Sequence, residues 1–284
     1  MMAIVRGTKL SNGVRTTIRY LMIFLVSLLV IFPLYWMLVT AVQDPEVTLR
    51  YPPVLYPIDP NIKGFHAIFI EKQMGQWLIN SGFVAILTTI LTSILSILGA
   101  YALSWFKWRG KMAFGLMLLF TQMLPEALIV IPIFKIYSNL HWSDSLATLS
   151  LIHAAFVIPV GVWILKPAFE GVPKEVNEAA QIDGCTPMGV LRKIIIPLCS
   201  PAILAVGVVA FFASWGEYLI AVTMISTEGK YPASVGLAST MSQLDTPIQT
   251  LLSGAIVYGL PPVILYMFIQ RFVISGLTAG AIKG

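Results

Sequence analysis

Residues 78–106 read LINSGFVAILTTILTSILSILGAYALSWF, a stretch without a single charged side chain. It is longer than the ~20 apolar residues that a helix needs to cross a ~30 Å hydrocarbon core. Comparable apolar stretches recur along the chain, and together they cover approximately residues 20–42, 78–106, 112–137, 146–165, 201–225 and 251–274. Apolar and polar residues do not alternate within them, which argues for helices and against the strands of a β-barrel. The pattern predicts an all-α integral membrane protein with about six transmembrane helices.

The composition agrees with this class, because 57% of the residues are hydrophobic and only 11% are charged. An average soluble domain carries roughly 25% charged residues. Proline lacks a backbone N–H and interrupts helices, so several of the predicted spans should be kinked or broken. The prolines within the spans are Pro33, Pro125, Pro132, Pro159, Pro261 and Pro262.

The basic residues predict the orientation of the spans, since positively charged loops resist translocation. Most of the 18 Lys and Arg residues lie in the N-terminal tail, in the second and fourth loops and at the C-terminal end. Both termini are therefore expected in the cytoplasm, and the net charge of +5 reflects topology rather than affinity for nucleic acid. The expected organisation is a cytoplasmic tail (1–19), a first helix with an external loop (20–77), a transmembrane domain (78–274) with a cytoplasmic loop (172–197), and a cytoplasmic C-terminal tail (275–284).

Two cysteines, Cys185 and Cys199, fall at the predicted cytoplasmic face. Thiols stay reduced in the cytoplasm, so no disulfide is expected. Neither cysteine belongs to a CxxC pair or has a histidine at ligand spacing, and the sequence therefore predicts no metal site.

The two longest external loops contain signals for short helices. Residues 43–77 begin with a proline-rich half and continue into an amphipathic piece, 65–70. This loop is either a connector or a docking lid. Residues 226–249 contain several turn residues and are a candidate for re-entry as a short helix.

The segment Pro173–Gly184 is water-compatible and has the signals of a short helix. Proline suits a first helical turn, where its missing N–H is not needed, and Glu175 places negative charge near the positive end of the helix dipole. Gly184 can take the positive φ angle that often follows the end of a helix. One face of this helix is small and apolar, and it consists of Val176, Ala179 and Ala180.

A second helix should follow, because Thr186 and Pro187 supply a cap and a first-turn residue, and Pro197 ends it. The expected product is a helix, a tight turn and a helix. The carboxylates of Glu178 and Asp183 are available to the Arg, Lys or backbone donors of a partner protein. The pattern alone leaves two interpretations open, namely a docking element and a solvated surface loop with ordinary capping.

A resemblance to a known family favours docking. The string EAAxxxG, followed after nine residues by IxxP, resembles the coupling-loop motif of ABC importer permeases. The residues that carry it are Glu178, Ala179, Ala180, Gly184, Ile194 and Pro197. The similarity covers roughly residues 70–284, is greatest to the maltose-type carbohydrate uptake branch, and includes Asn80–Ser81, Gly110–Lys111, Trp215–Tyr218 and Gln270–Arg271. Two positions depart from the family pattern, Ile196 in place of Leu and Gly216 in place of Asn.

The resemblance implies a permease subunit in a bacterial plasma (inner) membrane. Its implied partners are a second homologous permease, two ATPase subunits and an extracytoplasmic solute-binding protein. The short cytoplasmic helix would seat in a groove of one ATPase subunit. This chain contains no GxxxxGK[ST] phosphate loop, so it is expected to be a transport subunit and not an enzyme. No cofactor is expected in this chain, and ATP and Mg would belong to the partner ATPase subunits.

Several polar and aromatic residues are expected at one depth in the membrane. Ionisable groups in hydrocarbon usually face a cavity or one another, and aromatic rings beside hydrogen-bonding groups suit a sugar. The candidate solute path consists of Glu126, His153, Trp215, Glu217, Tyr218 and Tyr258. Structural alternatives stay open, such as a carboxyl group that stabilises a break at Pro125 and a satisfied interhelical histidine. Tyr101 and the aromatic residues of 105–108 are expected as interfacial anchors.

The main rival interpretation is a proton-coupled secondary transporter, in which Glu126, His153 and Glu217 relay protons. It predicts uptake by this chain alone, without ATP. An intramembrane enzyme is disfavoured, because the chain contains neither HExxH nor GxSxG.

Overall fold

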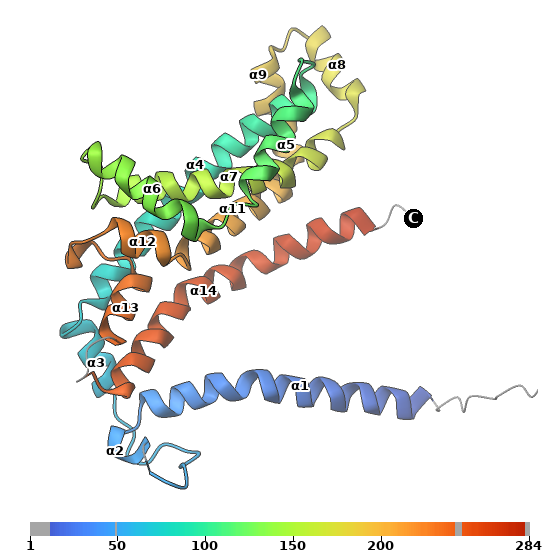
Figure 1. Cartoon of the computed structure of the whole chain (residues 1–284). Helices are drawn as coiled ribbons and strands as arrows, with labels where there is room; N and C mark the ends of the chain where they lie inside the picture. The colour runs from blue at the N-terminus through green and yellow to red at the C-terminus, as the bar shows by residue number, and fades with distance from the viewer. Residues whose placement is uncertain (1–11, 49, 242–245, 282–284) are drawn as a thin grey trace, which may run out of the picture. The chain divides into compact units, whose positions relative to one another are not determined.

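The computed structural model describes residues 12–48, 50–241 and 246–281, and every regular element in those ranges is a helix (Figure 1). These described residues include four continuous helices long and apolar enough to cross a membrane, or up to six spans if each of two bent helix pairs counts as one. The prediction of an all-α membrane protein with about six transmembrane helices is confirmed.

The continuous helices are α1 (Asn12–Ala41), α4 (Met74–Trp105), α7 (Leu146–Glu170) and α14 (Ile248–Ala281). α1 begins before the expected start of the first span at residue 20. The basic residues Arg15 and Arg19 end the apolar stretch but are good helix formers, so the helix includes them. Several prolines lie inside helices that continue through them, namely Pro33, Pro159, Pro261 and Pro262.

The third span is a bent pair of helices, α5 (Lys111–Thr121) and α6 (Glu126–Asn139), with an angle of 98° between them. Pro125 has an extended backbone, with φ −61° and ψ 128°, and directly precedes α6. Proline has no N–H to donate and clashes with the preceding turn, which favours a break between α5 and α6 at this position. The break expected at Pro125 is confirmed.

The fifth span differs from the expected continuous range of 201–225. α11 covers Ser200–Trp215 and stops, and a separate helix, α12 (Leu219–Met224), follows after a short break. Glu217 lies in this break, and its carboxylate accepts hydrogen bonds from two backbone N–H groups in the first turn of α12. The first N–H groups of a helix have no partner within it, so this side chain stabilises a new helix start where one continuous helix was expected.

Short helices occupy the connections between the spans. The amphipathic piece expected at 65–70 belongs to α3, and the short helix expected within 226–249 is α13. The short helices are α2 (Pro45–Thr48), α3 (Lys63–Ile70), α8 (Lys174–Ile182), α9 (Pro187–Val190), the π-helix η1 (Leu191–Ile195), α10 (Ile196–Leu198), the 3₁₀-helix η2 (Glu228–Lys230) and α13 (Ala233–Met241).

The described chain divides into two compact units. One unit contains the described residues up to Ile68 together with 246–256, and the other contains residues 69–241 and those from Val257 onward. Of the two predicted cytoplasmic tails, residues 1–11 and 282–284 lie outside the described ranges.

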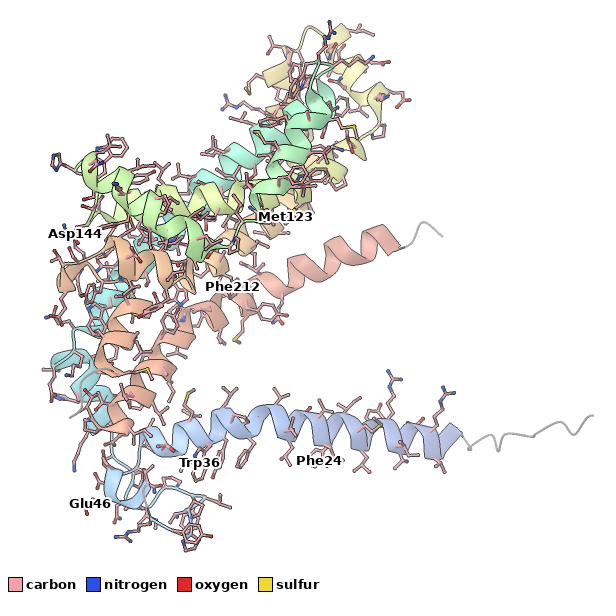
Figure 2. All side chains as sticks on the ribbon, in the orientation of Figure 1. Phe24, Trp36, Glu46, Met123, Asp144 and Phe212 are labelled. Atoms are coloured by element: carbon pink, nitrogen blue, oxygen red, sulfur yellow. The ribbon has the colours of Figure 1, made fainter. Side chains whose placement is uncertain are left out.

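The first unit joins the C-terminal end of α1 to the beginning of α14. The side-chain amide of Gln249 donates to Asn61 Oδ1 at 2.8 Å, and the hydroxyl of Ser253 donates to the carbonyl oxygen of Ala41 at 3.4 Å. Along α1, side chains such as Phe24 project outward with little protein around them within this unit (Figure 2). An apolar helix with so little protein contact is suited to lipid or to another subunit.

The second unit is built on α4, α7 and α11. Hydroxyl groups on α4 donate to backbone carbonyl oxygens on α7 at intervals of eight residues along both helices. The pairs are Thr88 with Ser150, Ser96 with Ile158, and Ser104 with Lys166, at 3.2, 3.2 and 3.3 Å. Because the residue numbers rise together, α4 and α7 run parallel. Lipid gives helices no hydrophobic reason to associate, so such hydrogen bonds and close contacts between small residues stabilise the pair.

Gly161 of α7 permits the close approach of the helices. A Cβ atom at this position would lie 2.9 Å from Ser96 Cβ and 3.0 Å from Val206 Cγ1, which is closer than ordinary contact. Gly207 of α11 has more room, since a Cβ atom there would lie 3.6 Å from Thr89 Cγ2. The helices α4, α7 and α11 are therefore closely packed at Gly161 and less so at Gly207.

Candidate functional site

The helix α8 begins one residue later than expected. Pro173 is the cap residue, with φ −57° and ψ 137°, and does not belong to the first turn. At the other end Gly184 has φ 83°, the positive value that was predicted. The N–H groups of Gly184 and Cys185 donate to carbonyl oxygens in the last turn of α8, at 3.0 and 2.9 Å. This pair of bonds is a Schellman motif, which fixes the direction of the chain after the helix.

The second helix of the predicted cytoplasmic loop, α9, begins at Pro187 as expected. The Thr186 hydroxyl accepts a hydrogen bond from the Gly189 N–H at 3.2 Å and caps it. The helix passes through the π-helix η1, continues beyond Pro197 and bends by 82° at Cys199, so Pro197 does not end it. A π-helical stretch is unusual in length and geometry and is often found at functional sites.

An exposed surface surrounds the turn between α8 and α9 and is called the coupling tip below. It consists of Glu178, Ala179, Ile182, Asp183, Gly184 and Met188. Ile182 is 86% exposed and Met188 is 51% exposed, although both side chains are apolar. Exposed apolar side chains beside carboxylates are typical of a contact surface for another protein. Ile182 and Met188 were not identified from the sequence, although Ile182 directly precedes Asp183 there.

The apolar face predicted on α8 is divided in the structure. Ala180 is buried, whereas Ala179 and Val176 are exposed. Ile194 is partly buried and packs against the same apolar cluster as Ala180, whereas Pro197 is exposed. The residues of the coupling motif therefore include exposed members and members that attach the segment to the helix core.

Tyr101 of α4 bonds directly to residues 172–197, called the coupling segment. Its hydroxyl donates to the carbonyl oxygen of Pro187 at 2.9 Å, and its side chain is buried with Phe169 and Leu191 in one apolar cluster. The expectation that Tyr101 is an interfacial anchor is wrong, because helix α4 directs its ring into the protein. The Cys199 thiol adds a weak bond to the Ala168 carbonyl oxygen at 3.4 Å. The segment that carries the coupling tip is thus attached to both α4 and α7.

A polar cluster lies where α11 ends. His153 Nδ1 is 2.9 Å from Ser214 Oγ, and His153 Nε2 is 3.1 Å from Glu217 Oε2. Ser214 donates to Thr88 Oγ1 at 3.2 Å. Glu217 Oε1 accepts the Ile220 N–H at 2.7 Å, and Oε2 accepts the next N–H of α12 at 2.9 Å. These contacts join α4, α7, α11 and α12.

Every polar group of this cluster has a hydrogen-bond partner. The His153 side chain is only 3% exposed and that of Glu217 only 13%. A buried charge without partners is very costly, and a satisfied network makes a rigid and specific core. The geometry therefore fits the structural alternative for His153 and gives Glu217 the role of holding the break between α11 and α12.

An aromatic stack borders the polar cluster. The Trp215 ring lies nearly parallel to Phe211 and Tyr258, with centroids 5.6 and 5.8 Å away. The Tyr258 hydroxyl donates to the Trp215 carbonyl oxygen at 2.8 Å. Trp215 is only 5% exposed, so little of its ring is accessible to a solute within this chain.

The structure thus groups four of the six candidate path residues, His153, Glu217, Trp215 and Tyr258. Tyr218 is separate, because its side chain is 44% exposed at the start of α12. Glu126 is exposed in the first turn of α6, and within the described part of the chain it makes no hydrogen bond or ion pair.

Asp144 connects the loop before α7 to the loop after α12 and was not identified from the sequence (Figure 2). Its carboxylate accepts hydrogen bonds from the N–H groups of Ser226 and Thr227, both at 3.0 Å, and from Lys230 Nζ at 2.8 Å. Partial burial alone would raise the pKa of Asp144, but the hydrogen bonds from Lys230 and Thr227 outweigh it and lower that pKa well below its ordinary value. Asn80 reinforces the same region by donating to the carbonyl oxygens of Gly229 and Tyr231.

Metal chemistry has no support in the described ranges. They contain no group of three or more His, Cys, Asp or Glu side chains that could hold a metal ion, and both cysteines are free thiols.

The long apolar helices of this chain, with the exposed helices α8 and α9 attached to them, define a helical membrane protein. Residues 94–278 match the family model described as "Binding-protein-dependent transport system inner membrane component". This match covers more than half of the chain. The chain therefore belongs to that family, whose members are permease components of ABC importers.

Individual relatives agree with this assignment. The sulfoquinovosyl glycerol transport system permease protein SmoH of Agrobacterium fabrum is 32% identical over 256 residues, which cover 89% of each chain. The trehalose/maltose transport system permease protein MalG of Thermococcus litoralis is 28% identical over 263 residues, covering 92% of this chain and 94% of MalG. The resemblance to maltose-type permeases is confirmed.

A solved structure shows the same fold. It belongs to a bacterial ABC transporter involved in the import of the acidic polysaccharide alginate, and one of its chains matches with a TM-score of 0.78 and 20% identity. The match covers 95% of this chain and 99% of that one. None of these relatives supports the proton-coupled alternative, and within the described residues no hydrogen bond or ion pair joins Glu126 to the His153–Glu217 pair.

Proposed function

We propose that this chain is the permease subunit of a bacterial importer for a carbohydrate. It would work with a second permease, two ATPase subunits that bind ATP and Mg, and an external solute-binding protein, with both termini in the cytoplasm. The names of the relatives support a sugar or sugar derivative, since SmoH is named for sulfoquinovosyl glycerol and MalG for trehalose and maltose.

The observation that carries this proposal is the construction of the coupling tip. Its outer residues, such as Ile182 and Glu178, are exposed, whereas Ala180 is buried in the helix core. Closure of an ATPase subunit would push the tip, and the bond from Tyr101 to Pro187 would carry that displacement into α4. Rigid elements joined by packed side chains are the physical means by which such movement travels.

For the solute, we propose a path along the exposed side of the break between α11 and α12. Tyr218 offers an aromatic ring there, and Gly216 is exposed beside it. His153, Glu217, Trp215 and Tyr258 would hold the break in shape and form the wall behind it. Glu126 would stabilise the start of α6, where a carboxylate interacts favourably with the positive end of the helix dipole.

The coupling role is tested by Glu178→Lys in the reconstituted transporter. A reversed charge on the coupling tip should reduce ATP-dependent uptake by about tenfold or more, because a lost charge-assisted contact at an interface costs about 1.5–3 kcal/mol. Uptake into vesicles and ATP hydrolysis are measured together with the amount of each subunit in the membrane.

Glu228→Lys is the matched control, because it makes the same charge change at an exposed residue of the external helix η2. Uptake should be close to that of the parent in this variant. Parent-level uptake with Glu178→Lys, or uptake by vesicles that lack the ATPase subunits, would show that the proposal is wrong.

A further inference from the structure

A cavity of about 490 Å³ opens at the end of the second unit that carries the coupling tip. It lies between the C-terminal end of α4, the first half of α5 and the last turns of α7. The lining residues that matter for its chemistry are Trp108, Lys111, Met112, Gly115, Trp163 and Lys166. The Ser104 hydroxyl of α4 bonds to the carbonyl oxygen of Lys166, and Tyr101 of α4 bonds to the coupling segment, which places the cavity at this end of the helices.

The cavity is cationic at its polar side. The Lys111 ammonium makes a long hydrogen bond of 3.4 Å to the Ser104 carbonyl oxygen. The Lys166 ammonium pairs with Glu170 at 2.8 Å and lies 5.8 Å from the centre of the Trp163 ring. An ammonium has three donors, so each lysine can share its charge with a further anionic oxygen. Lys107 and Arg109 flank the same region, and Glu170 is the acidic residue beside it.

The rest of the cavity is lined by apolar side chains, with a tryptophan at its edge. Met112 is 79% exposed and Leu116 is 42% exposed along the outer face of α5. Trp108 is 41% exposed, and its indole N–H donates to the Ala102 carbonyl oxygen at 3.3 Å, which fixes the ring at the edge. Tryptophan with lysine above an apolar surface is the arrangement found where a protein meets the headgroup layer of a membrane.

Gly115 makes room in the wall of the cavity. A Cβ atom there would already be in contact with Trp163 Cζ2, at 3.7 Å, so any larger side chain must extend into the space that is now open. The volume lies within the range of about 300–1,000 Å³ that is usual for small-ligand sites. Basic pockets between transmembrane helices on the cytoplasmic side bind acidic lipid headgroups.

We propose that this cavity binds one acidic phospholipid from the membrane leaflet on the coupling side. The phosphate would lie between Lys111 and Lys166, and the acyl chains would run along Met112 and Leu116. A lipid in this place would link α5 to α7 beside the coupling segment. The charge of the headgroup decides the binding, because a zwitterionic headgroup brings its own cation to the two lysines.

The test uses the assembled transporter and measures the phospholipid that stays bound. The complex is purified from vesicles that contain equal amounts of phosphatidylglycerol and phosphatidylcholine, and the retained lipids are counted by native mass spectrometry. The parent should retain phosphatidylglycerol in preference to phosphatidylcholine. Lys111→Gln and Lys166→Gln should each reduce this preference by about fivefold, the effect of one cation near an anionic surface.

A second variant tests the shape of the cavity without changing its charge. Gly115→Leu should reduce the retention of both lipids, because its side chain fills the apolar part. Arg192→Gln is the control, since it removes an exposed cation of η1 outside the cavity, and it should keep the parent preference. Equal retention of the two lipids by the parent overturns the proposal. The proposal is also overturned if the lysine variants retain phosphatidylglycerol with the same preference as Arg192→Gln.

Discussion

At the scale of single residues, Glu217 and Tyr218 are neighbours in the chain with different surroundings. Glu217 is enclosed by His153 and the first turn of α12, whereas Tyr218 faces outward. A carboxylate with this many partners is already satisfied, so a solute would have to break existing bonds to reach it. A half-exposed phenol ring has no such cost.

This difference predicts that substitutions at Tyr218 and Glu217 change different quantities, the KM at Tyr218 and the stability at Glu217. Tyr218→Ala should raise the KM for uptake by about twofold to tenfold, because the ring contributes roughly 0.5–1.5 kcal/mol by stacking. Tyr218→Phe should keep most of the affinity. Glu217→Gln should instead lower stability by about 1–3 kcal/mol with little change in KM. A raised KM in Glu217→Gln at parent stability would place the His153–Glu217 pair in the solute path.

Asp144 predicts a specific dependence of stability on pH. Its pKa in the folded protein is lowered, so its stabilising effect is complete above the ordinary aspartate value of about 3.9. As the pH falls below that value, the unfolded chain takes up a proton that the folded carboxylate resists. Stability should therefore fall with decreasing pH, and this part of the loss should be absent in Asp144→Asn.

The measurement is the thermal unfolding midpoint of the purified transporter at a series of pH values. Asp144→Asn should also have a lower midpoint at neutral pH, because the bond to Lys230 loses its charge. Asp59→Asn, which changes an exposed aspartate in the loop between α2 and α3, is the control and should leave the pH profile as it is in the parent. Parallel profiles for the parent and Asp144→Asn would contradict the assigned role.

At the scale of helices, the packing of α4, α7 and α11 predicts that two glycines respond differently to a methyl group. Gly161→Ala should destabilise the protein by about 1–3 kcal/mol, because its Cβ atom would overlap Ser96 and crowd Val206. Gly207→Ala has space beside Thr89 and should be nearly neutral. The measurement is the thermal unfolding midpoint of each variant in the same detergent. Equal midpoints would contradict the prediction that helix packing is closer at Gly161 than at Gly207.

The same helices show what the sequence contained and what it did not. The break at Pro125 was predictable because proline lacks a donor, and the turn at Gly184 because it needs a positive φ. The end of α11 at Trp215 was not, since Glu217 in an apolar stretch looked like a path residue rather than a cap for α12. The α7 partners of Thr88 and Ser96 could not be predicted either, because the sequence does not show which neighbouring helix a hydroxyl group faces.

At the scale of the whole molecule, the proposed function depends on transmission from the coupling tip to the helices that would enclose the proposed path. The apolar cluster around Leu191 carries most of this attachment, and the hydroxyl of Tyr101 adds one directional bond to Pro187. Apolar packing resists compression, whereas a hydrogen bond fixes the relative position of two backbones. Loss of the bond should therefore loosen the transmission without unfolding the protein.

Tyr101→Phe tests this transmission, because it removes the bond to Pro187 and keeps the ring in the apolar cluster. The ratio of solute imported to ATP hydrolysed should fall by up to about tenfold, since one hydrogen bond contributes about 0.5–1.5 kcal/mol. The amount of assembled transporter should stay close to that of the parent. Tyr20→Phe makes the same chemical change on the exposed surface of α1 and should keep the parent ratio. An unchanged ratio in Tyr101→Phe would mean that apolar packing alone couples the tip to α4.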